Sequence, residues 1–316
     1  MSISFPADKL EKIVRTFSLT EDEKDAFLKN ANRIIYHIGG VHPERIIEAI
    51  AEYAECIAGS KGAGYTPGIT EQTVGDVHIT RIDPPCGSNT YVLETKEGLL
   101  VVDAGYSCYA KELMQTICSL YPAFVSMQKE LIITHIDMDH AGAMPYFNRV
   151  YMNVTSRENF VREKTGRVNY RTKNPDRAPF YHVVEILTQY EAPPLSNIVL
   201  FDSVKPDLSL PLSYIGELKA AGLTFAVYEG SGGHVEGSMV FLEKERGLMF
   251  TGDVLVNPDG YTSGQKAYNR LPGLLAGGSV NEDSKKAVAE RHAVYELMKG
   301  REWTICPGHG AVFKSQ

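Results

Sequence analysis

The stretch Thr134-His135-Ile136-Asp137-Met138-Asp139-His140-Ala141-Gly142 places two histidines and two aspartates within six residues. The apolar run 131–133 directly before it is typical of a buried strand, so the polar side chains fall on the loop that leaves this strand. In a loop, side chains at this spacing can converge on one point, which no helical face allows. Imidazoles and carboxylates that converge at a strand end are the ligands of hydrolytic and redox metal sites. The alternative interpretation is a polar turn with capping aspartates.

Three more candidate ligands lie beside predicted strands or glycines further along the chain. His234 lies in a glycine-rich segment, Asp253 follows the strand 248–250, and His309 follows the strand 303–305. At such positions a side chain can reach over the edge of a sheet, where the sites of α/β proteins gather.

Length, charge and cysteine usage limit the classes of protein. A chain of 316 residues accommodates one large domain, with or without a small one. The net charge of −7 argues against general nucleic-acid binding. No apolar window is long enough for a membrane span, and residues 1–10 do not have the pattern of a signal peptide. The five cysteines are scattered without CxxC spacing, which predicts reduced thiols and a cytoplasmic location.

Residues 7–58 have the pattern of three amphipathic helices. Thr20 and Glu23 predict a capping box, and Pro43 is predicted to be the first residue of a helix. His37 and His42 are interpreted as structural or exposed. We divide the chain into a helical extension (1–60), a linker (61–71) and an α/β domain (72–316). Because so small a bundle is unstable alone, we expect it to pack on its own domain, form a wall of the substrate cavity, or build a homodimer.

After the linker, strands and helices alternate, which predicts an α/β fold. Apolar strands flank residues 94–98 as a hairpin, and a helix is expected over residues 109–120. Ser279 and Glu282 predict a capping box for a helix that runs to about Met298. Residues 145–220 have the weakest pattern.

Residues 157–177 hold seven Lys or Arg against three acidic residues, with Tyr170, Phe180 and Tyr181 nearby. One interpretation is a solvated, loop-rich surface. The other is a lid that presents cations and aromatic rings to an anionic small-molecule substrate.

Five elements, in this order over residues 72–314, resemble the metallo-β-lactamase superfamily. They are Asn89-Thr90-Tyr91 with Asp103-Ala104-Gly105, the 135–140 loop, Gly233-His234 with Gly237-Ser238, Thr251-Gly252-Asp253, and Pro307-Gly308-His309-Gly310. The resemblance implies an αββα sandwich with a one- or two-metal site at one edge; residues 7–58 have no counterpart in the minimal family pattern. It implies that His135, residue 137 and His234 hold one metal and that Asp139, His140 and His309 hold a second. Asp253 would bridge the two.

Asp137 stands where the family pattern has histidine, so the loop is HxDxDH instead of HxHxDH. With this carboxylate, three carboxylates and one hydroxide would balance two divalent ions, which favours iron or manganese over zinc. A similar replacement, by Glu, occurs in the flavodiiron branch. The sequence ends six residues after Gly310 without that branch's flavodoxin domain, and Gly233-His234 resembles the hydrolase version. If Asp137 points away instead, a single-metal site results.

The resemblance implies a metal-dependent hydrolase in which a metal-bound hydroxide attacks an ester, lactone, thioester or phosphoester. Asp139 would orient the nucleophile and take or relay its proton. One alternative is a diiron redox enzyme, which Asp137 favours. Another is a non-enzymatic protein whose helical extension mediates assembly, against which the complete ligand set argues.

Overall fold

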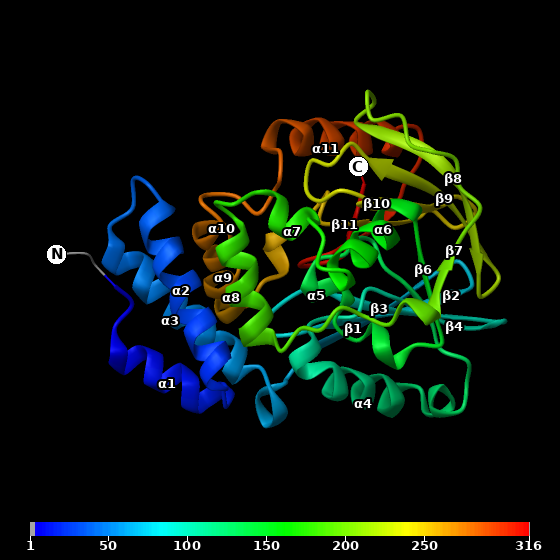
Figure 1. Cartoon of the computed structure of the whole chain (residues 1–316). Coiled ribbons are helices and arrows are strands. Elements are labelled where there is room, and N and C mark those ends of the chain that lie inside the picture. The colour runs from blue at the N-terminus through cyan, green and yellow to red at the C-terminus, as the bar shows by residue number, and fades with distance from the viewer. Residues whose placement is uncertain (1–3, 316) are drawn as a thin grey trace.

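Two β-sheets lie face to face between outer helices in the computed structural model, which describes residues 4–315 (Figure 1). The first sheet has the order β1-β2-β3-β4-β5-β6-β7, antiparallel as far as β4 and parallel from β4 to β7. Its strands are β1 Gly68–Val74, β2 Val77–Asp83, β3 Thr90–Thr95, β4 Gly98–Val102, β5 Glu130–Ile132, β6 Arg149–Met152 and β7 Ile198–Leu200.

The second sheet has the order β13-β12-β11-β10-β9-β8, in which only β11 and β12 run parallel. Its strands are β8 Leu212–Ala220, β9 Leu223–Gly230, β10 Met239–Glu243, β11 Leu248–Gly252, β12 Thr304–Pro307 and β13 Phe313–Lys314. β10 and β11 are buried at every position, as expected for strands covered on both faces.

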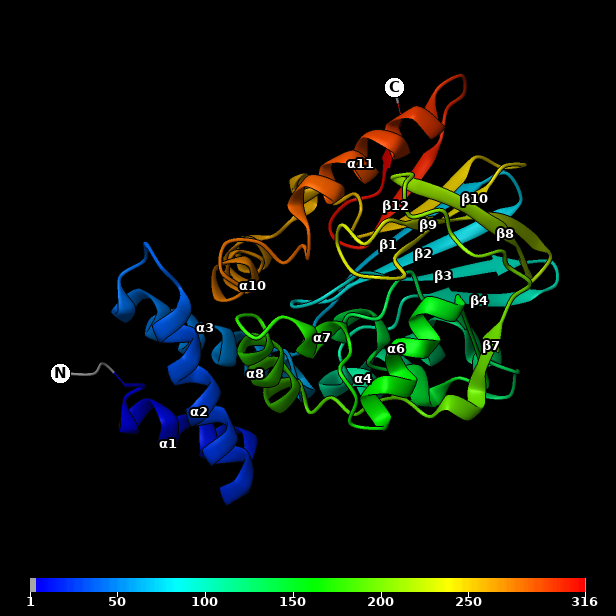
Figure 2. The same cartoon turned by 45° about the horizontal axis from the view of Figure 1, so that its top comes forward.

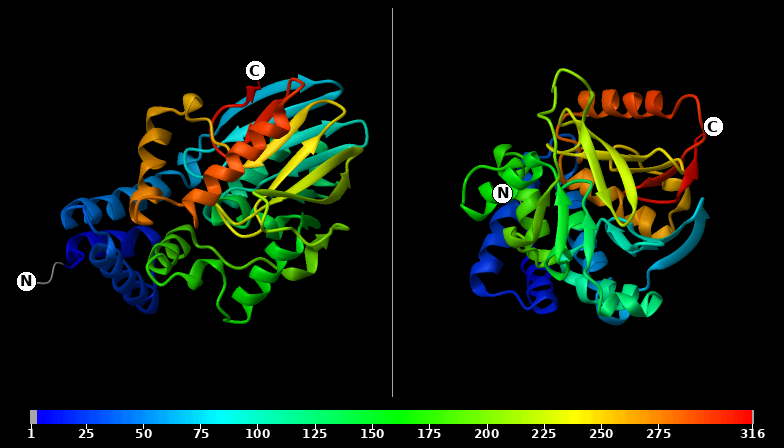
Figure 3. Two further views of the ribbon diagram at one scale, coloured as in Figure 1. Left: turned by 90° about the horizontal axis from the view of Figure 1, so that it is seen from above. Right: turned by 90° about the vertical axis from the view of Figure 1, so that its right-hand side faces the viewer.

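Helices cover the outer faces of the two sheets. α4 (Ala110–Leu120) lies against the first sheet and α11 (Ser284–Met298) against the second, so the layers run α11, second sheet, first sheet, α4 (Figure 3). α11 contributes Val294 and Met298 to a small apolar cluster with the outer face of the second sheet, and the main core fills the space between the sheets. The predicted αββα sandwich with added N-terminal helices is therefore confirmed.

The remaining helices lie at one end of the sandwich or in the connections between strands. They are α1 Ala7–Phe17, α2 Glu21–His37, α3 Pro43–Gly59, α5 Met138–Ala141, α6 Val154–Lys164, α7 Tyr170–Lys173, α8 Ala178–Thr188, α9 Ser263–Tyr268 and α10 Arg270–Leu275. The Thr20–Glu23 capping box and Pro43 open α2 and α3 as predicted. His37 and His42 are both exposed.

Two local predictions differ from the structure. β1 begins at Gly68, so the last four residues of the predicted linker belong to a strand paired with β2. The predicted capping box at Ser279 is wrong because Asp283 caps α11, accepting hydrogen bonds from the backbone of Lys285 and Lys286. Ser279 instead accepts a bond from the backbone of Asn281.

The N-terminal helices pack against helices of the α/β domain. α2 contacts α8, and α3 contacts both α8 and α10 (Figure 2). Tyr53 of α3 is fully buried there, where its ring stacks on Tyr268 at 5.7 Å between centroids. In the described part of the chain, no helix is both long enough and apolar enough to span a bilayer.

Candidate metal centre

The seven predicted ligands come from four loops that leave strands at the same edge of the sandwich. His135, Asp137, Asp139 and His140 follow β5, and the short helix α5 begins within this loop at Met138. His234 lies between β9 and β10, while Asp253 and His309 follow β11 and β12. Strand ends at one sheet edge bring together residues that lie more than 170 positions apart in the sequence.

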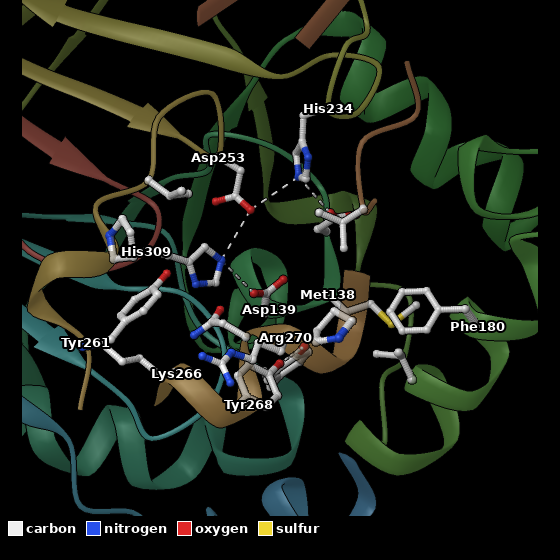
Figure 4. A pocket seen from close by; sticks show the side chains of 18 of the residues that line it. Met138, Asp139, Phe180, His234, Asp253, Tyr261, Lys266, Tyr268, Arg270 and His309 are labelled. Atoms are coloured by element: carbon white, nitrogen blue, oxygen red, sulfur yellow. Dashed lines mark hydrogen bonds and ion pairs between the residues drawn. The ribbon is translucent and has the colours of Figure 1, made fainter. Parts of the chain in front are cut away.

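Six of these side chains form two groups of three, and within each group the ligand atoms lie within 4.8 Å of one another. The first group is His135, His234 and Asp253, and the second is Asp139, His140 and His309. Asp253 stands between them: its Oδ2 is 3.4 Å from Nε2 of both His234 and His309 (Figure 4). Its Oδ1 is 3.3 Å from Nε2 of His140. This is the arrangement that a bridging carboxylate requires.

Asp137 faces the first group. Its Oδ2 lies 3.2 Å from Nε2 of His234 and 3.7 Å from Nε2 of His135. The side chain therefore points toward the site and not away from it, so the geometry favours a two-metal site over the single-metal alternative. Ligation by Asp137, like that of the other six residues, stays a prediction.

Hydrogen bonds to the far nitrogens orient the histidines. Nδ1 of His140 lies 2.9 Å from Oδ2 of Asp103, and Nδ1 of His234 lies 2.9 Å from Oδ1 of Asn281. Both partners accept, so each Nδ1 carries a proton, and in the neutral imidazole that binds a metal each Nε2 presents its lone pair to the centre. Nδ1 of His135 lies 3.1 Å from the hydroxyl of Thr134, which itself donates to Asp103.

The inward-facing atoms have no hydrogen-bond partner within the described chain. Nε2 of His135, His140 and His234 and Oδ1 of Asp253 are buried and unsatisfied. Orphaned buried polar atoms cost about 1–3 kcal/mol each, and their convergence fits a bound cation. The donor set of nitrogen and carboxylate oxygen suits zinc, iron or manganese.

The closely opposed charges shift the pKa values of the ligands. Burial raises the pKa of Asp253, but His309 and His140 outweigh it and hold that pKa well below its usual range. Burial lowers the pKa of His234, yet contact with Asp137 and the charge of Asp253 raise it to about 9. Divalent ions bound by neutral imidazoles would take over the charge that balances the carboxylates.

Glycines allow the loops to approach this closely. A Cβ at Gly308 would overlap Oδ1 of Asp253 and crowd His140. Gly252 has a φ of +49°, and a Cβ there would lie 2.6 Å from the hydroxyl of Thr134. Any side chain at either position would displace the residues that face the centre.

The centre opens into a cavity of about 540 Å³. Asp137, Asp139, His234, Asp253 and His309 line one part of it. The other walls come mainly from α8, α9, α10 and the segment after Asp253, with aromatic and aliphatic side chains (Figure 4). A cavity of this volume accommodates a small organic molecule.

The basic segment 157–177 does not supply cations to this cavity. Arg171 is buried against the Ile136 carbonyl and Glu163, and Lys173 pairs with Glu236 and Glu282. The basic residues that line the cavity are Lys266 and Arg270. Of the three aromatic residues named with this segment, Phe180 and Tyr181 line the cavity, whereas Tyr170 does not.

The sequence patterns did not single out several residues that complete the site. Asp103 marked the end of a strand, but its contact with His140 depends on its own left-handed backbone, with φ of 58°. Asn281 lay within the mistaken capping box. Tyr170 donates to Asp137 from 33 positions away, a contact that has no local sequence signal.

A family model described as the metallo-beta-lactamase superfamily matches residues 83–309. The chain therefore belongs to the metallo-beta-lactamase superfamily. No curated protein matches the sequence.

Solved structures similar to this chain include a metallo-beta-lactamase, a lactonase and a flavo di-iron protein. BLEG-1, a B3 metallo-beta-lactamase, is 17% identical with a TM-score of 0.44, over 78% of this chain and 94% of its own. AidC, a dizinc quorum-quenching lactonase, is 14% identical with a TM-score of 0.46, and the match covers 77% of this chain and 90% of AidC. A mutant flavo di-iron protein from Thermotoga maritima is 14% identical with a TM-score of 0.47, and the match covers 78% of this chain and 58% of the flavo di-iron protein.

Proposed function

We propose that the protein is a two-metal hydrolase that cleaves an ester, lactone, thioester or phosphoester of a small molecule. The observation that carries this proposal is the convergence of four histidines and three aspartates, five of which line one cavity. Two divalent ions, when bound, would lower the pKa of a water molecule and stabilise negative charge that develops on the substrate.

The chain's own residues would hold and direct these reactants. His135, Asp137 and His234 would hold one ion, His140, His309 and Asp139 the other, and Asp253 both. Asp139 lines the cavity, with its Oδ2 3.3 Å from Nε2 of His309. A carboxylate in that position can orient the attacking water and accept its proton. The apolar walls would exclude competing water and strengthen electrostatic interactions inside the cavity.

The test uses the full-length protein loaded separately with zinc, iron and manganese. We expect at least one loaded form to hydrolyse a member of a panel of esters, lactones, thioesters and phosphodiesters, and chelation to abolish that activity. Asp139→Asn should lower kcat by about 10²–10⁴-fold, the usual size of a general-base contribution, when the rate is expressed per chain that holds two ions. Loaded protein that is inactive toward every class would contradict the proposal.

The second candidate is a diiron redox enzyme, which the orientation of Asp137 toward His135 and His234 favours. A third carboxylate makes the site harder and suits iron. Reduced, iron-loaded protein exposed to oxygen distinguishes the two. With excess ascorbate supplied as the electron donor, oxygen consumption over several turnovers with a change in the visible spectrum supports redox chemistry, whereas ester hydrolysis without it supports the hydrolase.

A further inference from the structure

Two basic side chains face the cavity without a charged partner. Lys266 lies near the end of α9 and Arg270 begins α10, and both line the cavity on the same side (Figure 4). Across residues 4–315, neither side chain makes an ion pair or a hydrogen bond. By contrast, Arg171 and Lys173 are neutralised by nearby glutamates.

The charges of the metal centre do not compensate these two cations. The carboxylates that line the cavity in the described chain are Asp137, Asp139 and Asp253. All three belong to the ligand set, and two divalent ions would more than balance them. With metals bound, the cavity therefore carries a net positive charge, to which Lys266 and Arg270 contribute two units.

A chain of buried tyrosine hydroxyls ends at the same side of the cavity. The hydroxyls of Tyr53 and Tyr106 are 3.1 Å apart, and those of Tyr106 and Tyr268 are 2.7 Å apart. Burial raises the pKa of all three, so each carries its proton. The three hydroxyls carry three protons, and the two hydrogen bonds between them use two of these protons. One proton therefore remains.

The position of that remaining proton depends on the direction in which the three tyrosine hydroxyls donate to one another. If Tyr268 donates to Tyr106 and Tyr106 to Tyr53, the remaining proton belongs to Tyr53 and stays buried among the three hydroxyls. In the opposite direction, Tyr268 offers its proton to the cavity, which Tyr106 and Tyr268 line and Tyr53 does not. An anionic acceptor beside Tyr268 would select this second direction.

The walls around these donors are mainly apolar. Tyr261 and Asn269 add two polar groups to the lining. The apolar side chains are those of Phe180 and Val184 from α8, together with Val256, Pro258, Pro272 and Val280. These side chains suit a hydrocarbon portion of a ligand and offer it no hydrogen bond.

We propose that Lys266, Arg270 and the hydroxyl of Tyr268 bind an anionic group of the substrate, a carboxylate or a phosphate, and that the rest of the substrate is mainly apolar. The inference rests on the proposed hydrolase and names its substrate class: an amphiphile whose scissile bond reaches the metal centre while its anionic end contacts α9 and α10.

Equilibrium binding tests this subsite without requiring hydrolysis. Octanoate, octylphosphonate (a phosphate analogue whose C–P bond is not hydrolysed) and octanol are titrated calorimetrically into metal-loaded, full-length protein, into Lys266→Met/Arg270→Met, and into Tyr268→Phe. The control is Lys285→Met/Arg291→Met, two exposed positions on α11 outside the cavity lining, which changes the net charge equally. Metal content is measured for every variant.

We expect the cavity double variant to bind at least one anion about tenfold more weakly, as for a lost charge-assisted hydrogen bond. Tyr268→Phe should lower the affinity for the same anion to a smaller extent. The affinity for octanol should be unchanged in every variant, and the α11 control should bind all ligands like the wild type. The anion whose affinity falls more in the cavity double variant identifies carboxylate or phosphate as the preferred group. Equal losses in both double variants, unchanged binding in the cavity variant, or no anion binding by the wild type would each overturn the proposal. Because binding is measured without turnover, a subsite that binds as expected in a protein without hydrolase activity would overturn only the hydrolase.

Discussion

The hydroxyl of Tyr170 lies 2.7 Å from Oδ1 of Asp137, while Oδ2 of the same carboxylate faces His135 and His234. The Ile136 carbonyl lies 3.0 Å from the same hydroxyl, but Arg171 already donates to that carbonyl. Burial raises the pKa of Tyr170 well above its usual value, so the phenol remains a donor. Tyr170 therefore fixes one oxygen of Asp137 and leaves the other to face the metal centre.

Tyr170→Phe should weaken metal binding at the first group. Loss of the hydrogen bond frees Asp137 to rotate, and outer-shell partners of this kind are worth about 10–100-fold in metal affinity. The measurement is a competition titration against a chromogenic chelator. Tyr181→Phe is the matched control, because this neighbouring ring packs on Tyr170 at 5.7 Å and its hydroxyl does not contact Asp137. Equal affinity in both variants would show that the hydrogen bond does not position Asp137.

Asp137→His should leave the protein folded and shift its preference from iron toward zinc. The change replaces an anionic oxygen donor with a neutral nitrogen donor, which makes the site softer. The iron-to-zinc selectivity of the variant is measured in a competition titration with both ions. Selectivity identical to that of the wild type would mean that residue 137 does not ligate.

His140→Ala should remove most of one equivalent of metal. Its Nε2 belongs to the second group, and its Nδ1 is held by Asp103. Elemental analysis after reconstitution should give close to one ion per chain for this variant. His292→Ala, an exposed histidine of α11, should retain two. A His140→Ala protein that is folded and holds as much metal as the control would remove His140 from the ligand set.

Removal of residues 1–60 should lower activity while metal is retained. The extension covers α8 and α10, and Tyr53 supports Tyr106 and Tyr268 at the cavity wall. Its loss should therefore loosen the substrate cavity more than the metal centre, which metal content and activity of the truncated chain report separately.

Homodimer formation by the extension stays a prediction, and the same truncated protein tests it. Light scattering should show a dimer for the full chain and a monomer after truncation if the extension mediates assembly. An unchanged mass with lower activity would mean that the extension forms a wall of the substrate cavity and does not mediate assembly. A soluble truncated chain with unchanged mass and full activity contradicts both roles.

The parts of the fold and site that could be predicted follow from local patterns. Thr20 and Glu23 lie three residues apart and satisfy each other's backbone groups, so the start of α2 was visible in the sequence. The candidate ligands were predictable because strand ends and glycines mark loops where side chains of distant segments meet.

The features that were not predicted depend on long-range contacts. Arg171 belongs to a basic segment for which we expected a solvated surface or a substrate lid, yet it is buried because Glu163 and the Ile136 carbonyl satisfy it. β8 was not recognised because Gly216 interrupts its alternation with a bulge. The contact of Tyr170 with Asp137 forms only after α7 packs against the loop that follows β5.

The central claim is that this chain holds two metal ions, and metal stoichiometry tests it most directly. Full-length protein is reconstituted with zinc, iron or manganese, freed of unbound ions, and analysed for metal and protein in the same sample. The account predicts close to two divalent ions per chain for the preferred metal. Less than half an ion per chain for every metal would contradict it.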